Sequence, residues 1–300
     1  PYGSEALRRV RQHWFFLVLV LFVLGFFVVV ERADHRNFYY IAVFLPAVVA
    51  LLRSSEYRAY FLSRPVLIVL HQETSTPGRI GNALRALGYP LDIRRPRFGD
   101  TLPDTLEMHA GAVICGGPMS ANDPDDYVRR EIDWISVPLR EQRPFLGICL
   151  GAQMLARQLG ARVAPHPQGR VEVGYYPVSP TDAGRALCPD WPARVYHWHG
   201  EGFRLPDGAD LLATGDDFPV QAFQFGNAFG LQFHPDVTYA MMHRWTTRGC
   251  ARLDSPGAQP VHQHFAGRAV HDAAERAWLK HFIDGWIARV PRPMLLQAAE

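Results

Sequence analysis

Lysine is almost absent from this 300-residue chain, and cysteine is sparse. Lys280 is the single lysine among 31 basic residues, and the scattered arginines are matched by 29 acidic residues, which argues against a nucleic-acid-binding surface. Cys115, Cys149, Cys188 and Cys250 lie far apart and form no C-x-x-C pair. This spacing excludes a disulfide-rich scaffold, a zinc knuckle and a redox dithiol, and it favours a reducing, cytosolic setting for the main domain.

Charge is absent from two stretches near the N-terminus, residues 14–30 and 38–52. As a helix, the first stretch would rise about 25 Å, which approaches the ~30 Å hydrocarbon core of a bilayer once polar flanking residues snorkel. The second stretch is shorter and contains Pro46. We expect residues 1–64 to form a transmembrane helical hairpin that turns at residues 31–37.

The basic residues around these stretches predict the orientation of the hairpin. Arginines precede the first stretch and follow the second, whereas the turn balances two arginines with two acidic residues. By the positive-inside rule both termini lie in the cytoplasm, so the hairpin would tether a cytoplasmic domain to the inner membrane. Two alternatives stay open. The first is a cleaved signal peptide, although no small-x-small cleavage site follows Val30, and the second is a buried segment of a soluble core. The flanking arginines are Arg8, Arg9, Arg11, Arg53, Arg58 and Arg64.

After Pro65 the sequence alternates short apolar runs with amphipathic segments, a pattern typical of a parallel sheet covered by helices. We expect an α/β domain over residues 65–290, followed by a tail at 291–300. The expected strands are residues 66–70, 111–115, 145–148, 171–178, 195–198, 220–225 and 229–233. The expected helices are residues 80–87, 127–140, 150–159, 241–247 and 273–287.

Residues 147–151 form a G-x-C-x-G sequence between an expected strand and an expected helix. This is the layout of a nucleophile elbow, with Cys149 in the place of serine. The flanking glycines allow a sharp turn, and the positive end of the helix favours the thiolate of Cys149. The N–H of Leu150 would face a developing oxyanion, and the turn at residues 116–118 would supply a second N–H.

A base for this thiol is predicted at His234. The residue before a proline is held in an extended conformation, so Pro235 places His234 and Asp236 on the same side of the chain. The carboxylate would then hold one ring nitrogen while the other faces the sulfur. Cys149, His234 and Asp236 are therefore candidates for a triad of nucleophile, base and orienting carboxylate.

Three sequence blocks resemble the signatures of class I, triad-type glutamine amidotransferases. They are Pro144-Phe-Leu-Gly-Ile-Cys-Leu-Gly-Ala-Gln153, Gly116-Gly-Pro118 and Gly230-Leu-Gln-Phe-His-Pro-Asp236. Further similarity, to stand-alone proteins that resemble the glutaminase half of GMP synthase, lies at residues 116–123, 172–177 and 197–200. The resemblance extends from about Pro65 to Trp286.

This resemblance implies a flavodoxin-like, doubly wound, mostly parallel sheet and hydrolysis of the glutamine amide through a γ-glutamyl thioester, with no metal and no cofactor. The sequence departs from the family pattern at Asp236, where glutamate is usual, and at Glu201, where aspartate is usual. The implied residues are Cys149 as nucleophile, His234 as acid and base, Asp236 as its partner, Gly117 and Leu150 as oxyanion donors, and Gln153, Trp198, His199 and Gly200 along the substrate pocket.

Three functions remain open from the sequence. The leading one is a glutaminase that takes L-glutamine and supplies ammonia to a synthetase partner, because residues 237–300 are too few to form a synthetase domain. The second is a self-sufficient γ-glutamyl peptide or amide hydrolase. The third is a catalytically weak, membrane-tethered regulatory module. Residues 38–46 also resemble the start of O-antigen-ligase-type membrane proteins, so the N-terminal region could be either a working anchor or the remnant of a gene fusion.

Other conspicuous residues are expected to be structural. Cys115 lies in a buried strand, and the C-terminal aromatic residues recur at helical spacing. His197 and His199 have the spacing of metal ligands, but no acidic or cysteine partner is recognisable near them in sequence, so we expect no metal. The aromatic residues Trp278, Phe282 and Trp286 are expected to pack against the sheet. The histidines His262, His264 and His271 are expected in a surface loop.

Overall fold

The computed structural model describes residues 64–289. The hairpin expected over residues 14–30 and 38–52, and the tail at 291–300, lie outside the described residues. Within residues 64–289, no helix combines the length and the apolar character that crossing a membrane requires.

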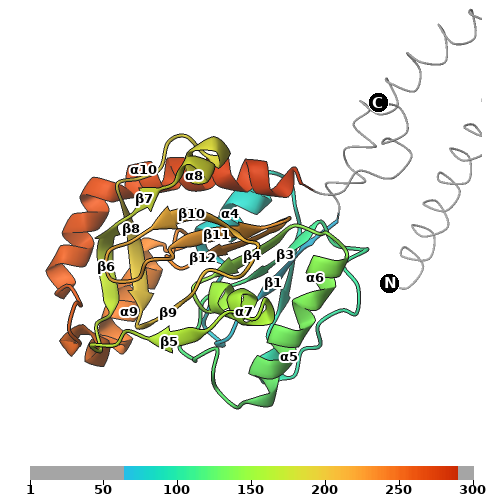
Figure 1. Ribbon diagram of the computed structural model, residues 1–300, viewed down its shortest axis with the longest axis horizontal. Coiled ribbons are helices and arrows are strands. Elements are labelled where there is room, and N and C mark those ends of the chain that lie inside the picture. Colours follow the sequence, from blue (N-terminus) through green and yellow to red (C-terminus); the bar gives the residue numbers. More distant parts are fainter. Residues whose placement is uncertain (1–63, 290–300) are drawn as a thin grey trace, which may run out of the picture. The chain divides into compact units, whose positions relative to one another are not determined.

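A mostly parallel sheet of eight strands forms the centre of the fold, as expected (Figure 1). The strand order is β2-β1-β3-β4-β12-β11-β10-β7. The first five strands in this order are parallel, and the last three join antiparallel. The strands are β1 (Val66–Val69), β2 (Leu91–Arg94), β3 (Gly111–Ile114), β4 (Phe145–Ile148), β7 (Ser179–Pro180), β10 (Asp210–Thr214), β11 (Ala222–Phe225) and β12 (Ala228–Leu231).

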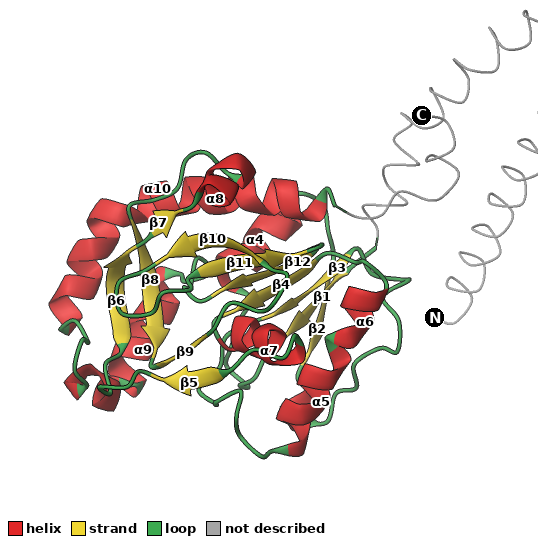
Figure 2. Ribbon diagram, in the orientation of Figure 1, coloured by secondary structure: helices red, strands yellow, loops and turns green. Residues whose placement is uncertain are grey.

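Helices cover both faces of the sheet because its parallel strands are apolar on both faces (Figure 2). In β1, Val66 and Ile68 pack on one side and Leu67 and Val69 on the other. The first side is covered by α4 (Gly78–Ala86) and α10 (Val261–Ile287), and the second by α5 (Asp126–Trp134), α6 (Ser136–Arg140) and α7 (Leu150–Gln158). The remaining helices are α8 (Asp182–Leu187), α9 (Tyr239–Arg248), η1 (Pro96–Phe98) and η2 (Cys250–Asp254).

Two small antiparallel sheets extend the fold beyond the carboxyl end of β4. One pairs β5 (Val163–Pro165) with β9 (Glu201–Phe203), and the other pairs β6 (Glu172–Pro177) with β8 (Arg194–His199). The register of the second sheet sets Glu172 opposite His199. A carboxylate and an imidazole that are distant in sequence therefore become neighbours.

Two expectations about helices were wrong. The single helix expected over residues 127–140 is two helices, α5 and α6, because Pro138 has no N–H to donate to the carbonyl of Trp134. The loop expected around three histidines is instead part of α10, which begins after Pro260. Its Gly267 lies against the ring of Tyr175, where a Cβ would come within 2.6 Å, so this glycine serves close packing and not a turn.

The histidines of α10 differ in their surroundings. His264 is fully buried, with Nδ1 2.9 Å from the Tyr196 hydroxyl and Nε2 donating to the Gln259 carbonyl at 2.9 Å. His271 packs against the Tyr175 ring, and His262 is exposed. The aromatic residues Trp278, Phe282 and Trp286 are buried on the sheet, which confirms that prediction.

Candidate active site

Cys149 lies in a sharp turn between β4 and α7. Its backbone has φ +49° and ψ −101°, a conformation that residues other than glycine rarely adopt and that the surrounding contacts must hold in place. One such contact is the hydrogen bond from its N–H to the Leu231 carbonyl of β12, at 2.7 Å. A Cβ on Gly147 would lie 2.4 Å from the Gly151 carbonyl oxygen, and one on Gly151 would lie 2.1 Å from that of Ile114. Both flanking positions therefore require glycine.

His234 and Asp236 follow β12 and lie beside this turn. The Nδ1 of His234 is 3.0 Å from Oδ1 of Asp236, the pairing expected from the extended His-Pro-Asp segment. The His234 N–H donates to the Tyr196 carbonyl at 2.7 Å, and its ring packs edge-on against Trp245. Because Asp236 occupies Nδ1, the Nε2 atom is left for Cys149. Cys149, His234 and Asp236 are each no more than 4% exposed.

The charge of His234 results from two opposing effects. Burial disfavours the imidazolium, but the negative charges and hydrogen bonds of Cys149 and Asp236 overcome burial and raise the pKa of His234 to about 10. The His234 ring is therefore an imidazolium at neutral pH, a form able to give a proton to a leaving group.

A second thiol nearby has a different character. Cys115 lies at the end of β3 and is buried, as predicted. Burial and the neighbouring Asp236 raise the pKa of Cys115 well above its ordinary value. Cys115 therefore stays a neutral thiol, although it borders the same cavity as His234.

Residues 116 and 117 pass between His234 and the first turn of α7. A Cβ on Gly116 would lie 2.5 Å from Cε1 of His234, and one on Gly117 would lie 3.0 Å from Cδ2 of Leu150. Within residues 64–289, neither the Gly117 N–H nor the Leu150 N–H donates to a protein acceptor. The Leu150 N–H also lies at the positive end of α7. These are the two groups expected to bind an oxyanion.

The residues expected along the substrate pocket do not all border the cavity beside His234. Gln153 is buried, and its amide donates to the Glu201 carbonyl at 2.9 Å. His199 donates from Nδ1 to the same carbonyl at 3.0 Å. Both side chains thus hold the start of β9, whereas Trp198 borders the cavity and Gly200 does not.

The cavity has a volume of about 290 Å³ and borders both His234 and Asp236. Residues 116–118 and Trp198 form one part of its wall, and residues 74–76 form another. Three arginines that the sequence analysis missed also line it, Arg244, Arg248 and Arg252 from α9 and the following η2. No salt bridge neutralises these arginines within the described residues, so the cavity carries positive charge. The four-residue spacing of Arg244 and Arg248 was the available signal, with Arg244 inside the expected helix at residues 241–247 and Arg248 directly after it.

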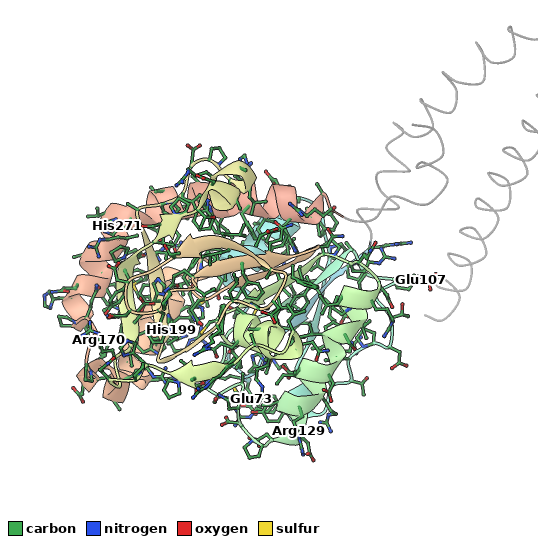
Figure 3. All side chains as sticks on the ribbon, viewed as in Figure 1. Glu73, Glu107, Arg129, Arg170, His199 and His271 are labelled. Atoms are coloured by element: carbon green, nitrogen blue, oxygen red, sulfur yellow. The ribbon has the colours of Figure 1, made fainter. Side chains whose placement is uncertain are left out.

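One group of described residues has the composition of a metal site. The metal-ligating atoms of Glu172, His197 and His199 all lie within 4.8 Å of one another and are buried. A His–His–carboxylate set suits zinc, and the structure supplies the carboxylate that seemed to be missing near the two histidines. In the structure these atoms bind one another: Oε2 of Glu172 lies 2.9 Å from Nε2 of His199 and 3.3 Å from Nδ1 of His197, and it accepts a hydrogen bond from Gln221 at 2.8 Å. Figure 3 shows His199 inside the fold, in contrast to Arg129 on the surface.

Comparison with known proteins identifies the class. The family model for class-I glutamine amidotransferases matches residues 70–247, more than half of the chain. The chain therefore belongs to the class I glutamine amidotransferase family, a family of glutamine-hydrolysing enzymes.

Individual relatives agree with this assignment. The chain is 31% identical over 183 residues to the glutamine amidotransferase-like protein YfeJ of Salmonella typhimurium, covering 58% of this chain and 76% of that protein. It is 33% identical over 171 residues to the glutamine-hydrolyzing GMP synthase of Thermomicrobium roseum, covering 55% of this chain and only 31% of the synthase. The crystal structure of a glutamine amidotransferase from Methylobacillus flagellatus matches with a TM-score of 0.71 and 25% identity, over 77% of this chain and 97% of that one.

Proposed function

We propose that this protein hydrolyses the side-chain amide of L-glutamine through a thioester on Cys149 and supplies the ammonia to an acceptor bound by a separate synthetase. The observation that carries the proposal is the contact of His234 with both Cys149 and Asp236, which raises the pKa of His234 to about 10. An imidazolium held against a thiol favours the thiolate, which is the nucleophilic form.

The reaction follows from these groups. The Cys149 thiolate attacks the amide carbon, and the charge on the oxygen is taken by the Gly117 and Leu150 N–H groups. His234 gives its proton to the departing nitrogen, which leaves as ammonia, and a γ-glutamyl thioester remains. A water molecule then attacks the thioester and gives a proton to His234, and collapse releases glutamate and the Cys149 thiolate.

The proposed use of the ammonia rests on the name of one relative. The chain spans 31% of the Thermomicrobium synthase, a protein named both for GMP synthesis and for glutamine hydrolysis. The match to the family model, residues 70–247, includes the cysteine elbow and the His-Pro-Asp segment. We propose that the ammonia is used by a synthetase that docks beside the cavity.

Glutamate release from L-glutamine tests the proposal. Replacing Cys149 with alanine removes the nucleophile, and we expect the rate to fall by about 10⁴-fold or more. Cys115→Ala is the matched control, because it removes a buried thiol from the cavity wall, and we expect it to retain most of the activity. A Cys149→Ala variant with the parental rate would refute the thioester route.

The positive cavity favours a second candidate, a hydrolase of γ-glutamyl peptides whose leaving amine bears a carboxylate. Arg248 and Arg252 are exposed at the cavity and could bind such a carboxylate. Without any partner, such an enzyme would cleave γ-glutamylglutamate faster than glutamine, and Arg248→Ala with Arg252→Ala would remove this preference. Equal slow turnover of all γ-glutamyl compounds would instead favour the partner-dependent enzyme.

We further propose that the charge-free stretches at residues 14–30 and 38–52 tether this domain to the inner membrane, with both termini in the cytoplasm. The support is the distribution of arginines around the stretches. Sedimentation with membranes after an alkaline wash is the expected result for the full chain. Recovery of the full chain in the supernatant would exclude the tether.

A further inference from the structure

We propose that His71 and Glu131 are positioning residues that aim the Gly117 N–H at the oxyanion, an inference that rests on the proposed function. Neither residue belongs to the sequence blocks that predicted the active site. They come from different layers of the fold, since His71 follows β1 and Glu131 lies on α5. Their side chains meet beside the turn that carries Gly116 and Gly117.

Both side chains are completely buried, and their contacts are specific. The Nδ1 atom of His71 lies 3.1 Å from the Gly116 carbonyl oxygen, and its Nε2 atom lies 2.8 Å from Oε2 of Glu131. Each side chain is 0% exposed. Burying an imidazole and a carboxylate is costly unless they are hydrogen-bonded. Within the described residues Oε1 of Glu131 has no hydrogen-bond partner, so the contact of Oε2 with His71 is the side-chain interaction that offsets the burial of this carboxylate.

The arrangement of protons places a donor on the Gly116 side. A backbone carbonyl only accepts, so Nδ1 must carry a hydrogen to bond it. The other nitrogen then either donates to an ionised Glu131 or accepts from a protonated Glu131. In both forms one proton lies between Nε2 and Glu131, and Nδ1–H faces Gly116. Glu131 thus selects the state of the ring that binds the turn.

The bond to Gly116 acts on Gly117 because the two share one peptide plane. The Gly116 carbonyl and the Gly117 N–H belong to the same rigid, planar unit and point in opposite directions. Holding the oxygen toward His71 therefore directs the N–H away from His71. Glycines have little other restraint on their backbone, so without this bond the peptide at 116–117 is free to rotate.

Gly117 is placed to use this orientation. Gly117 packs between His71 and Leu150, since an added Cβ would lie 3.1 Å from Cβ of His71 and 3.0 Å from Cδ2 of Leu150. Gly116 lies against the His234 ring. A fixed peptide between the base and the elbow is what a preorganised oxyanion hole requires, because donors that must first reorient lose much of their effect.

Two matched pairs of variants test this role. In His71→Asn the amide nitrogen is as far along the side chain as Nδ1, so it still donates to Gly116, whereas in His71→Gln it reaches the Nε2 position and turns to Glu131. In Glu131→Gln the amide donates to Nε2 and keeps Nδ1–H toward Gly116, whereas Glu131→Leu removes the partner. His71→Asn and Glu131→Gln should therefore preserve function, and the other two substitutions should impair it.

The expected effect is on kcat and not on KM. Loss of a whole oxyanion donor costs about 10²- to 10³-fold, so misorientation in His71→Gln should lower kcat for glutamine by roughly tenfold to a hundredfold, with KM unchanged. His71→Asn should remain within about threefold of the parent. Thermal unfolding of all four variants identifies any that fail to fold, and the conservative member of each pair then carries the comparison.

Two thiol reagents separate this inference from the proposed function. Acylation of Cys149 by p-nitrophenyl acetate creates an oxyanion, whereas alkylation by iodoacetamide does not. His71→Gln and Glu131→Leu should slow acylation about tenfold or more relative to alkylation, whether or not the parent protein hydrolyses glutamine. An unchanged ratio of the two rates in both variants would overturn the positioning role. A parent that acylates normally but releases no glutamate would instead overturn the proposed function.

Discussion

Two buried clusters of histidine and carboxylate differ in the charge of the imidazole. At His234, one imidazole faces two anions, Asp236 and Cys149, and its pKa is raised to about 10. At His197, burial is the main effect, and the single carboxylate of Glu172 is shared with His199, so the pKa of His197 falls to about 3. The first ring is cationic at neutral pH, and the second is neutral.

The difference teaches that a nearby carboxylate does not by itself make a buried histidine a cation. Burial opposes the charge in both clusters, and the number of anions per imidazole decides the outcome. His234 and Asp236 border the cavity, whereas the cluster with two imidazoles joins β6 to β8. This difference agrees with the proposed role of His234 in proton transfer, and it favours a packing role for the second cluster.

The largest difference between the two clusters is expected when the same substitution, histidine to asparagine, is made in each of them. His234→Asn keeps a donor near Asp236 but removes the nitrogen left for Cys149, so glutamate release should fall by about 10²- to 10⁴-fold. His197→Asn keeps the bonding position of Nδ1, and we expect less than about a tenfold loss. Steady-state kinetics on both proteins make the comparison, and equal losses would show that the clusters do not differ in role.

An intermediate effect is expected from removing one of the two anions at His234. Asp236→Asn lowers the pKa of His234, because only Cys149 is left to oppose burial, and the thiolate loses part of its counterion. Iodoacetamide should then alkylate Cys149 roughly tenfold more slowly at neutral pH. Asp236→Glu keeps the carboxylate and its charge, so it serves as the control. An alkylation rate that is the same in Asp236→Asn as in the parent would contradict this account.

The smallest effect concerns Glu275 of α10, a buried carboxylate that no imidazole contacts within the described residues. Burial raises the pKa of Glu275 to about 8, although the Tyr196 N–H donates to it. The folded protein keeps this proton at pH values where the unfolded chain, with a pKa near 4.5, has lost it. The contribution of Glu275 to stability is therefore fully present below its unfolded pKa and is lost as the pH rises through about 8.

Glu275→Gln removes this decline because the amide does not ionise. From about pH 5 to about pH 9, the variant should lose less unfolding free energy than the parent, by on the order of 4 kcal/mol. Urea unfolding at both pH values measures the difference. Asp284→Asn on the same helix is the control, since Asp284 is partly exposed beside Lys280. Parallel pH profiles for the parent and Glu275→Gln would contradict the raised pKa.

The triad geometry was predictable because each part is local in sequence. The strand, turn and helix around Cys149 are encoded by glycines at fixed offsets, and Pro235 extends the chain between His234 and Asp236. The parallel core strands were likewise visible as short apolar runs. Strands β2 and β10 escaped prediction because they are only partly buried and so lack a continuous apolar run.

Long-range pairs were not predictable in the same way. Nothing local marks His71 and Glu131 as partners, because their contact depends on how α5 packs on the sheet. Glu172 meets His199 only through the register of β6 and β8. In α10, Gly267 indicated a loop by composition, whereas its small size in fact lets the helix approach Tyr175. Tertiary packing decided each of these, and the local pattern did not.

The position of β12 has a consequence for how activity arises during folding. This strand inserts between β4 and β11, and its Leu231 carbonyl holds the Cys149 N–H. After β4 the chain builds the two small sheets and the antiparallel strands β7, β10 and β11, and β12 then pairs with β4. Cys149 and His234 therefore meet only after the most non-local strand pairing of the described fold has formed. A nascent chain that has not completed this return has an unactivated thiol. Reactivity of Cys149 therefore reports completion of the fold, and two fragments divided before β10 would regain it only by reassociating.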